Sequence, residues 1–184
     1  MKIDFEQETL HDMLREPARC DEGFRRLMAL YGSKLYWHIR RIVVSHDDAE
    51  DVMQETCIRI LQSIDSLRST DKLLTWIYSI ATNESLRMLR RHTRLFQSID
   101  SLESKLKDTL EAEVQTDGQT IEMMFQKALL TLPTQQRIAF NMRYYDDMSY
   151  EEISEVTGKS VGTLKTNYHY AKERIKKYIK ENGL

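Results

Sequence analysis

Helix-breaking residues are scarce in this sequence, whose 184 residues include only two prolines and six glycines. Proline interrupts a helix and glycine weakens it, so this scarcity favours helix along the whole chain. No segment alternates apolar and polar residues as a half-buried strand does, and no internal repeat is present. The composition therefore predicts an all-α fold.

Long apolar runs are absent as well. No stretch approaches the roughly 18 uninterrupted apolar residues that a membrane-spanning helix needs. Residues 1–14 carry acids where a secretory signal peptide would be basic and then apolar. We therefore expect a cytoplasmic protein.

The residues that build metal and catalytic sites are few and scattered. The two cysteines, Cys20 and Cys57, lie far apart, and the five histidines show no ligand spacing. The sequence contains no glycine-rich phosphate loop, no His-Glu-x-x-His pair and no recognisable nucleophile arrangement. We expect no disulfide, metal, cofactor or small-molecule substrate, and an enzyme is the least favoured interpretation.

Charge is unevenly distributed, although the formal net charge is only −2. Residues 159–180 hold seven Lys or Arg and one acid, and a second basic stretch occupies residues 87–94. Between them, residues 96–122 hold seven acids and two lysines. Two basic stretches separated by an acidic one favour two separate contacts with a polyanion.

Apolar residues at steps of three and four predict three helices in the first half of the chain. The first runs from Phe24 to Ile39 and the third from Leu73 to about Leu95. Between them, Ser45 supplies capping chemistry for a helix with an acidic outer face. The expected buried face of this second helix comprises Ala49, Val52, Met53, Ile58, Ile60 and Leu61.

The second half begins with a segment that resembles a linker. Residues 97–120 are rich in acids and poor in aromatic residues, which is typical of weak order. Helical periodicity resumes at Ile121, breaks at Pro133 and continues to Tyr145. We therefore predict two small helical domains, residues 1–95 and 120–184, joined by an acidic flexible linker, residues 96–119.

The last two predicted helices form the most informative motif. Ser149 and Glu152 have capping-box spacing at the start of a short helix that ends near Gly158. Ser160 then begins a longer helix whose buried face starts at Val161 and Leu164. A short helix, a tight turn and a basic second helix indicate a helix-turn-helix that reads the DNA major groove. An ordinary helical hairpin with a solvated charged face is the alternative.

Three blocks of sequence resemble those of extracytoplasmic-function sigma factors, in that family's order. Residues 149–165, preceded by Leu132-Pro133 and residues 143–145, resemble the promoter-reading helix-turn-helix. Residues 48–57 resemble the polymerase-binding helix, and residues 75–83 with 89–91 resemble the helix that melts and reads the downstream promoter element. The resemblance covers most of the chain from about Phe24 onward.

This resemblance implies roles for particular residues. Acceptor-rich residues of the second helix would bind core RNA polymerase: Asp48, Glu50, Asp51, Gln54 and Glu55. The downstream element would be held by Arg68, Asn83, Arg87, Arg90, Arg91 and Arg94. The upstream element would be read or held by Lys159, Ser160, Thr163, Lys165, Thr166, His169, Tyr170 and Arg174. A solvated charged face is the alternative for the polymerase-binding set and for the upstream set.

Further expectations concern Trp76, the loop at residues 69–72, the linker and the partners of the protein. Trp76 is interpreted as a core residue in preference to a base-stacking platform. Ser69 to Lys72 replace the family's usual glycine and aromatic residues, which leaves the loop's base preference undetermined. The resemblance implies that the acidic linker passes near the polymerase's nucleic-acid channels, and a mere tether is the alternative. The resemblance also implies an anti-sigma partner and a stress or envelope response, while a stand-alone helix-turn-helix regulator is the competing function.

Overall fold

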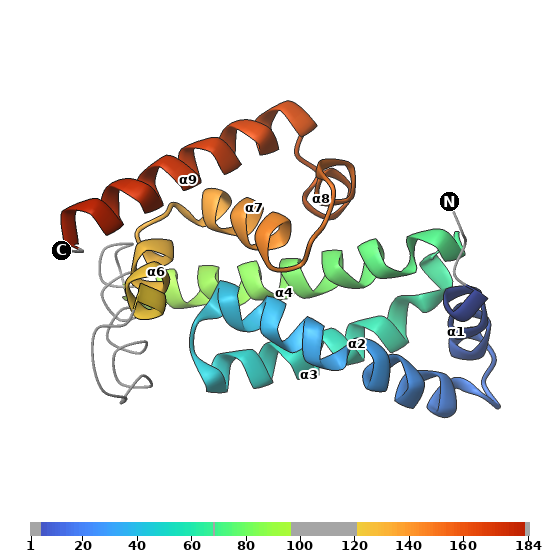
Figure 1. Cartoon of the computed structure of the whole chain (residues 1–184). Coiled ribbons are helices and arrows are strands. Elements are labelled where there is room, and N and C mark those ends of the chain that lie inside the picture. Colours follow the sequence, from blue (N-terminus) through green and yellow to red (C-terminus); the bar gives the residue numbers. More distant parts are fainter. Residues whose placement is uncertain (1–4, 68, 97–120, 183–184) are drawn as a thin grey trace.

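Every regular element in the described part of the chain is a helix, as the composition predicts (Figure 1). The computed structural model describes residues 5–67, 69–96 and 121–182. Two single 3-10 turns, Ile64–Ser66 and Thr70–Lys72, connect the third and fourth helices. The α-helices are α1 (Phe5–Arg15), α2 (Cys20–Val43), α3 (His46–Ser63), α4 (Leu73–Phe96), α6 (Ile121–Leu130), α7 (Thr134–Tyr144), α8 (Tyr150–Thr157) and α9 (Val161–Asn182).

The N-terminal region, α1 to α4, is built around α2. Leu27, Leu35 and Ile39 of α2 are buried against α3 and α4, as the apolar stripe predicts. The expected face of α3 is only partly correct, because Ile58 and Leu61 are 42% and 41% exposed. The buried residues of α3 are Ala49, Val52, Thr56 and Ile60, which follow one another at steps of three, four and four along one side of the helix.

Helix α1 is an element that the sequence interpretation missed. Its Leu10, Met13 and Leu14 are buried against α2 and against the turns between α3 and α4. Gly23 permits the close approach, because a Cβ at that position would lie 2.8 Å from Met13 Cβ. The helical spacing of these three apolar residues is the signal that predicts this element.

The C-terminal region, α6 to α9, packs around a smaller apolar cluster. Phe140 lies at its centre and stacks on Tyr144 and Tyr168, with ring centroids 5.2 and 5.4 Å apart. Pro133 separates α6 from α7 at the predicted break. The predicted linker, residues 96–119, lies outside the described residues except for Phe96 at the end of α4.

The two regions pack against each other over α2, α4, α7 and α8 (Figure 1). Buried residues of α7 and α8, including Met142 and Ile153, belong to the same apolar cluster as the core of the N-terminal region. The sequence predicted two domains but gave no indication of this contact. Residues of this shared core are apolar at helical spacing, and local periodicity does not reveal which helix they meet.

Candidate functional site

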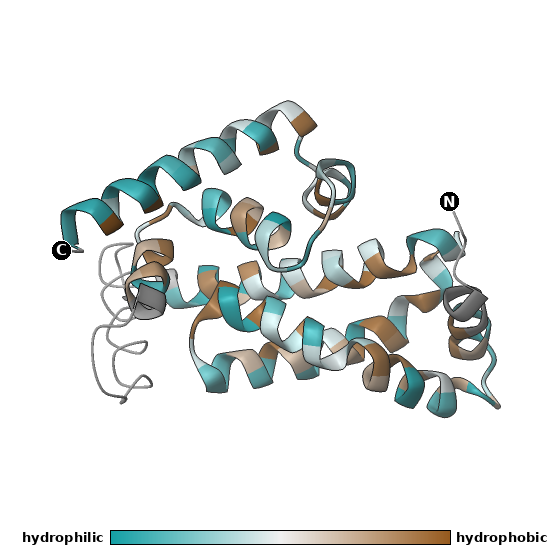
Figure 2. Ribbon diagram, viewed as in Figure 1, coloured by the Kyte–Doolittle hydropathy of each residue, from teal (hydrophilic) through white to brown (hydrophobic). Residues whose placement is uncertain are grey.

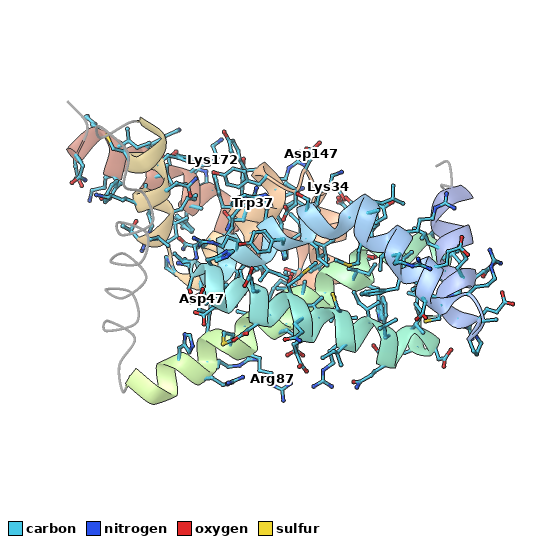
Figure 3. The ribbon with its side chains drawn as sticks, turned by 90° about the horizontal axis from the view of Figure 1, so that it is seen from below. Lys34, Trp37, Asp47, Arg87, Asp147 and Lys172 are labelled. Carbon is cyan, nitrogen blue, oxygen red and sulfur yellow. The ribbon has the colours of Figure 1, made fainter. Side chains whose placement is uncertain are left out.

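A hollow of about 440 Å³ runs between α3 and α4. Three of the five predicted polymerase-binding residues line one side of it, namely Asp51, Gln54 and Glu55. Arg87 and Arg91 of α4 line the other side, and Figure 3 shows Arg87 projecting from this side of the molecule. Arg59 connects the walls, with its Nε 3.2 Å from Glu55 Oε1 and 3.6 Å from Glu84 Oε1.

The other two acids of this set lie outside the hollow. Glu50 is exposed, and its Oε1 lies 3.3 Å from His46 Nε2. Asp48 lies near the end of α4, with its Oδ1 3.6 Å from His92 Nε2. The structure therefore divides the predicted acidic set into an inner group of three residues and an outer group of two.

Two apolar residues extend the inner group along α3. Asp51, Gln54, Ile58 and Leu61 follow one another at steps of three, four and three, so they share one side of the helix. Ile58 lines the hollow, and Ile58 and Leu61 are both exposed. The sequence interpretation assigned them to the core, although this spacing from Asp51 is visible in the sequence. The surface thus combines acceptors with exposed apolar groups.

A polar and cationic strip follows the outer side of α4. Asn83, Arg87 and Arg90 are exposed and share one face at steps of four and three. Asn83 Nδ2 donates a weak hydrogen bond to Ser79 Oγ at 3.5 Å, which leaves its carbonyl oxygen available. Trp76 is half-buried against the core, as expected. Arg68 and the side chain of Arg94 lie outside the described residues.

Helices α8 and α9 form the predicted helix-turn-helix. Glu152 N–H donates to Ser149 Oγ at 3.1 Å, and Ser149 N–H donates to Glu152 Oε2 at 2.7 Å, which completes the capping box. Gly158 has φ of 66°, a conformation that favours glycine, and it ends α8. Thr163 N–H donates to Ser160 Oγ at 3.2 Å and thereby caps α9.

The predicted reading side of α9 is open to solvent. Leu164, Ala171 and Ile175 are buried, as the periodicity predicts. Figure 2 shows that most residues of α9 are hydrophilic. The eight residues of the predicted upstream set are exposed: Lys159, Ser160, Thr163, Lys165, Thr166, His169, Tyr170 and Arg174.

Two lysines of α9 have neighbouring side chains that interact with their charge. Lys165 Nζ lies 5.7 Å from the centroid of the Tyr150 ring. Lys176 donates to Glu173 at 2.9 Å and lowers the pKa of that carboxyl. Arg174 therefore offers a better test of a phosphate contact than Lys176, whose charge is already paired.

Across residues 5–67, 69–96 and 121–182, no three His, Cys, Asp or Glu side chains gather as metal ligands do. No helix in these ranges is long and apolar enough to cross a membrane.

Comparisons with known proteins match both regions of the chain. Residues 27–95 match the Sigma-70 region 2 family, and residues 122–175 match Sigma-70, region 4. The chain is similar to the solved sigma factor RpoE in complex with the anti-sigma factor NepR from Bartonella quintana, at 24% identity and a TM-score of 0.68. That match covers 86% of this chain and 98% of the solved one. The structure of CnrH in complex with the cytosolic domain of CnrY gives 18% identity and a TM-score of 0.69, covering 99% of this chain and 100% of that one.

Curated relatives extend the match over most of the chain. The extracytoplasmic-function sigma factor SigW of Bacillus subtilis is 28% identical, over 87% of this chain and 90% of its own length. The sigma-E factor of Escherichia coli K12 is 29% identical, over 84% of this chain and 85% of its own. Because residues 27–95 match region 2 of the Sigma-70 family, the two alternative interpretations, a stand-alone helix-turn-helix regulator and an enzyme, are excluded. The chain belongs to the extracytoplasmic-function family of RNA polymerase sigma factors.

Proposed function

We propose that this sigma factor docks on core RNA polymerase through the hollow between α3 and α4. The observation that carries the proposal is the side of α3 on which Asp51 and Gln54 adjoin the exposed Ile58 and Leu61. Acceptors surrounding apolar groups suit a partner helix that combines cationic and apolar side chains. Asp48 and Glu50 lie outside the hollow and contribute longer-range attraction to the same partner.

The two DNA surfaces divide promoter recognition between them. Lys165, Thr166, His169 and Tyr170 lie on the first turns of α9, the part of such a helix that reaches base edges. Lys159 and Arg174 hold phosphates. On α4, Asn83 binds an unpaired base of the downstream element, and the arginines Arg87, Arg90 and Arg91 hold the backbone.

A groove between the two regions suits a regulatory protein partner. A groove of about 430 Å³ is lined by apolar residues, including Trp37, Leu129 and Leu130, and by Arg40 and Arg41. Such a groove suits an amphipathic helix that carries acids, which is the chemistry we assign to an anti-sigma factor. We place the protein in the cytoplasm, in a stress or envelope response like that of its relatives. A pull-down of the sigma factor from unstressed native cells tests whether such a partner is bound.

The polymerase assignment is tested by reversing two charges in the hollow, with Asp51→Lys and Glu55→Lys combined. Two new cations would repel the cationic partner, and we expect core binding to weaken by about 2 kcal/mol or more. Binding is measured by titrating labelled sigma factor with the core polymerase of the source bacterium. The double variant should still bind upstream-element duplex as well as the wild type does.

Glu50→Lys provides a matched control on the same helix. It makes the same change of charge outside the hollow, so its effect should be small and should disappear at high salt. Undiminished core binding by the double variant contradicts the assignment. An equal loss in the Glu50→Lys variant assigns the contact to the whole acidic side of α3.

A further inference from the structure

A buried carboxylate joins the two regions of the molecule. Asp146, in the turn between α7 and α8, has a side chain that is only 4% exposed. Its Oδ2 lies 2.6 Å from His38 Nδ1, and Arg41 donates to its Oδ1 at 3.3 Å. Because a carboxylate removed from water needs charged or hydrogen-bonding partners, Asp146 depends on α2 for its stability in this position.

Helix α4 fixes the orientation of the histidine. His38 is 1% exposed, and its Nε2 lies 2.9 Å from Thr82 Oγ1. The Thr82 hydroxyl also donates to the Tyr78 carbonyl at 2.7 Å. Both ring nitrogens of His38 therefore have hydrogen-bond partners, Nδ1 on Asp146 and Nε2 on Thr82. The Arg41 guanidinium supplies a positive charge beside the Asp146 carboxylate.

Side chains of α7 strengthen the same contact. Arg137 donates to the Ile42 carbonyl at 3.3 Å, and Asn141 donates to the Arg41 carbonyl at 3.4 Å. Both carbonyls belong to the last turn of α2, where no helical partner satisfies them. The Asn141 side-chain oxygen is buried without a hydrogen-bond partner among the described residues, which makes the contact less stable than a fully satisfied one.

A second bridge lies at the start of α4. Lys72 Nζ donates to Glu155 Oε1 of α8 at 2.8 Å, and Thr75 Oγ1 donates to Glu155 Oε2 at 3.3 Å. Ile153 of α8 belongs to the apolar cluster against which Trp76 packs. The first half of α4 is therefore covered by α8 (Figure 1).

Helix α8 covers only the start of α4. The start of α4, which leads to Asn83, lies beneath α8, whereas the reading side of α9 is exposed. Figure 3 shows Lys34 and Trp37 of α2 on the same side of the molecule as Asp147. These three residues, together with Arg41 and Asp146, line one hollow of about 260 Å³ between the regions.

We propose that Asp146, His38 and Arg41 form a latch that holds the free factor closed. In the closed form α8 covers the first half of α4, whereas Asn83, Arg87 and the reading side of α9 stay exposed. Opening of the latch lets the two regions move apart. This inference does not rest on the proposed function of α4.

The latch is tested with Asp146→Asn, which removes the charge and retains the shape. Without the carboxylate charge, the ratio of closed to open molecules should fall by about tenfold or more. The radius of gyration of the full-length factor, measured by small-angle X-ray scattering, should then increase. Asp147→Asn is the matched control, because that neighbouring side chain is 98% exposed and its loss should leave the radius unchanged. A helical Asp146→Asn protein with the wild-type radius overturns the latch.

A cross-linking experiment tests the latch independently of the scattering measurement. It includes a second variant in case Asp146→Asn is poorly folded. A carbodiimide joins a lysine and a carboxylate in contact, so it should link Lys72 to Glu155 in the closed wild type. Peptide mapping should detect this link less often in Asp146→Asn and equally often in Asp147→Asn. In a well-folded Asp146→Asn protein, a yield equal to wild type overturns the latch. If that protein is unfolded, Arg41→Gln, which removes the second charge from the partially exposed side of the cluster, provides the same comparison.

Discussion

The two regions of this sigma factor present their functional groups in different ways. The N-terminal region offers a hollow between two helices, in which acids adjoin exposed apolar side chains. The C-terminal region offers one exposed helix that carries hydroxyl, aromatic and cationic groups. A concave surface with apolar groups suits a protein partner, whereas outward donors on a single helix suit the major groove.

Their cores differ as well. The N-terminal core draws on four helices and shares its apolar cluster with α7 and α8. The C-terminal region has its own smaller cluster, in which aromatic rings stack around Phe140. The C-terminal region should therefore be more sensitive to the loss of a single side chain.

Phe140→Ala should have the largest effect on this comparison. Removal of the buried ring should lower the free energy of unfolding by about 3–5 kcal/mol. Urea denaturation measures the loss, and hydrogen exchange should locate it in α7 and α9. Tyr144→Ala, a change of an exposed ring on the same helix, should cost about 1 kcal/mol. Equal costs for the two variants contradict a core centred on Phe140.

Substitutions on α9 should separate base contacts from phosphate contacts. Lys165→Ala or Tyr170→Ala should cost about 1–3 kcal/mol on the cognate upstream duplex and much less on unrelated DNA. Arg174→Ala should weaken both nearly equally and reduce the salt dependence by about one unit. Binding isotherms at several salt concentrations measure both effects. Equal losses on the two duplexes for Lys165→Ala and Tyr170→Ala would contradict the placement of the reading side.

The smallest expected effect concerns the interface between the regions. Burial, followed by the nearby charge of Asp146, raises the pKa of the Tyr78 hydroxyl above its usual 10. Because the folded-state pKa lies above the unfolded value, the stabilisation is complete below about pH 10 and is lost as the pH rises further. Between pH 10 and 11, wild type should lose about 1 kcal/mol more stability than Tyr78→Phe. Identical losses in urea titrations would indicate that Tyr78 is not buried beside Asp146.

Local periodicity predicted most of the helices and the exposed side of α9. The stripe from Val161 to Tyr178 fixed which residues face outward, because a helix on one surface buries one face. Capping chemistry at Ser149 and Ser160 predicted two helix starts that the structure confirms. The exposure of Ile58 and Leu61 was not predicted, because an apolar residue near a stripe is ordinarily assigned to the core.

Local sequence patterns did not predict contacts between distant parts of the sequence. His38 and Asp146 are 108 residues apart, and nothing near either residue indicates the other. A lone buried histidine and a turn aspartate are common, and only the packing of α7 and α8 on the N-terminal region brings these two together. Sequence and structure give the position and the chemistry of the site residues. Their roles are predictions that binding and transcription experiments test.

Initiation by the Asn83→Ala variant tests the division of labour between the regions most directly. Open-complex formation with core polymerase is measured on a fully paired promoter and on one whose downstream element is already unpaired. The variant should bind core polymerase normally, lose activity on the paired promoter and recover it partly on the unpaired one, because the cost of unpairing has been removed. Equal loss on both templates would contradict a role for α4 in strand separation.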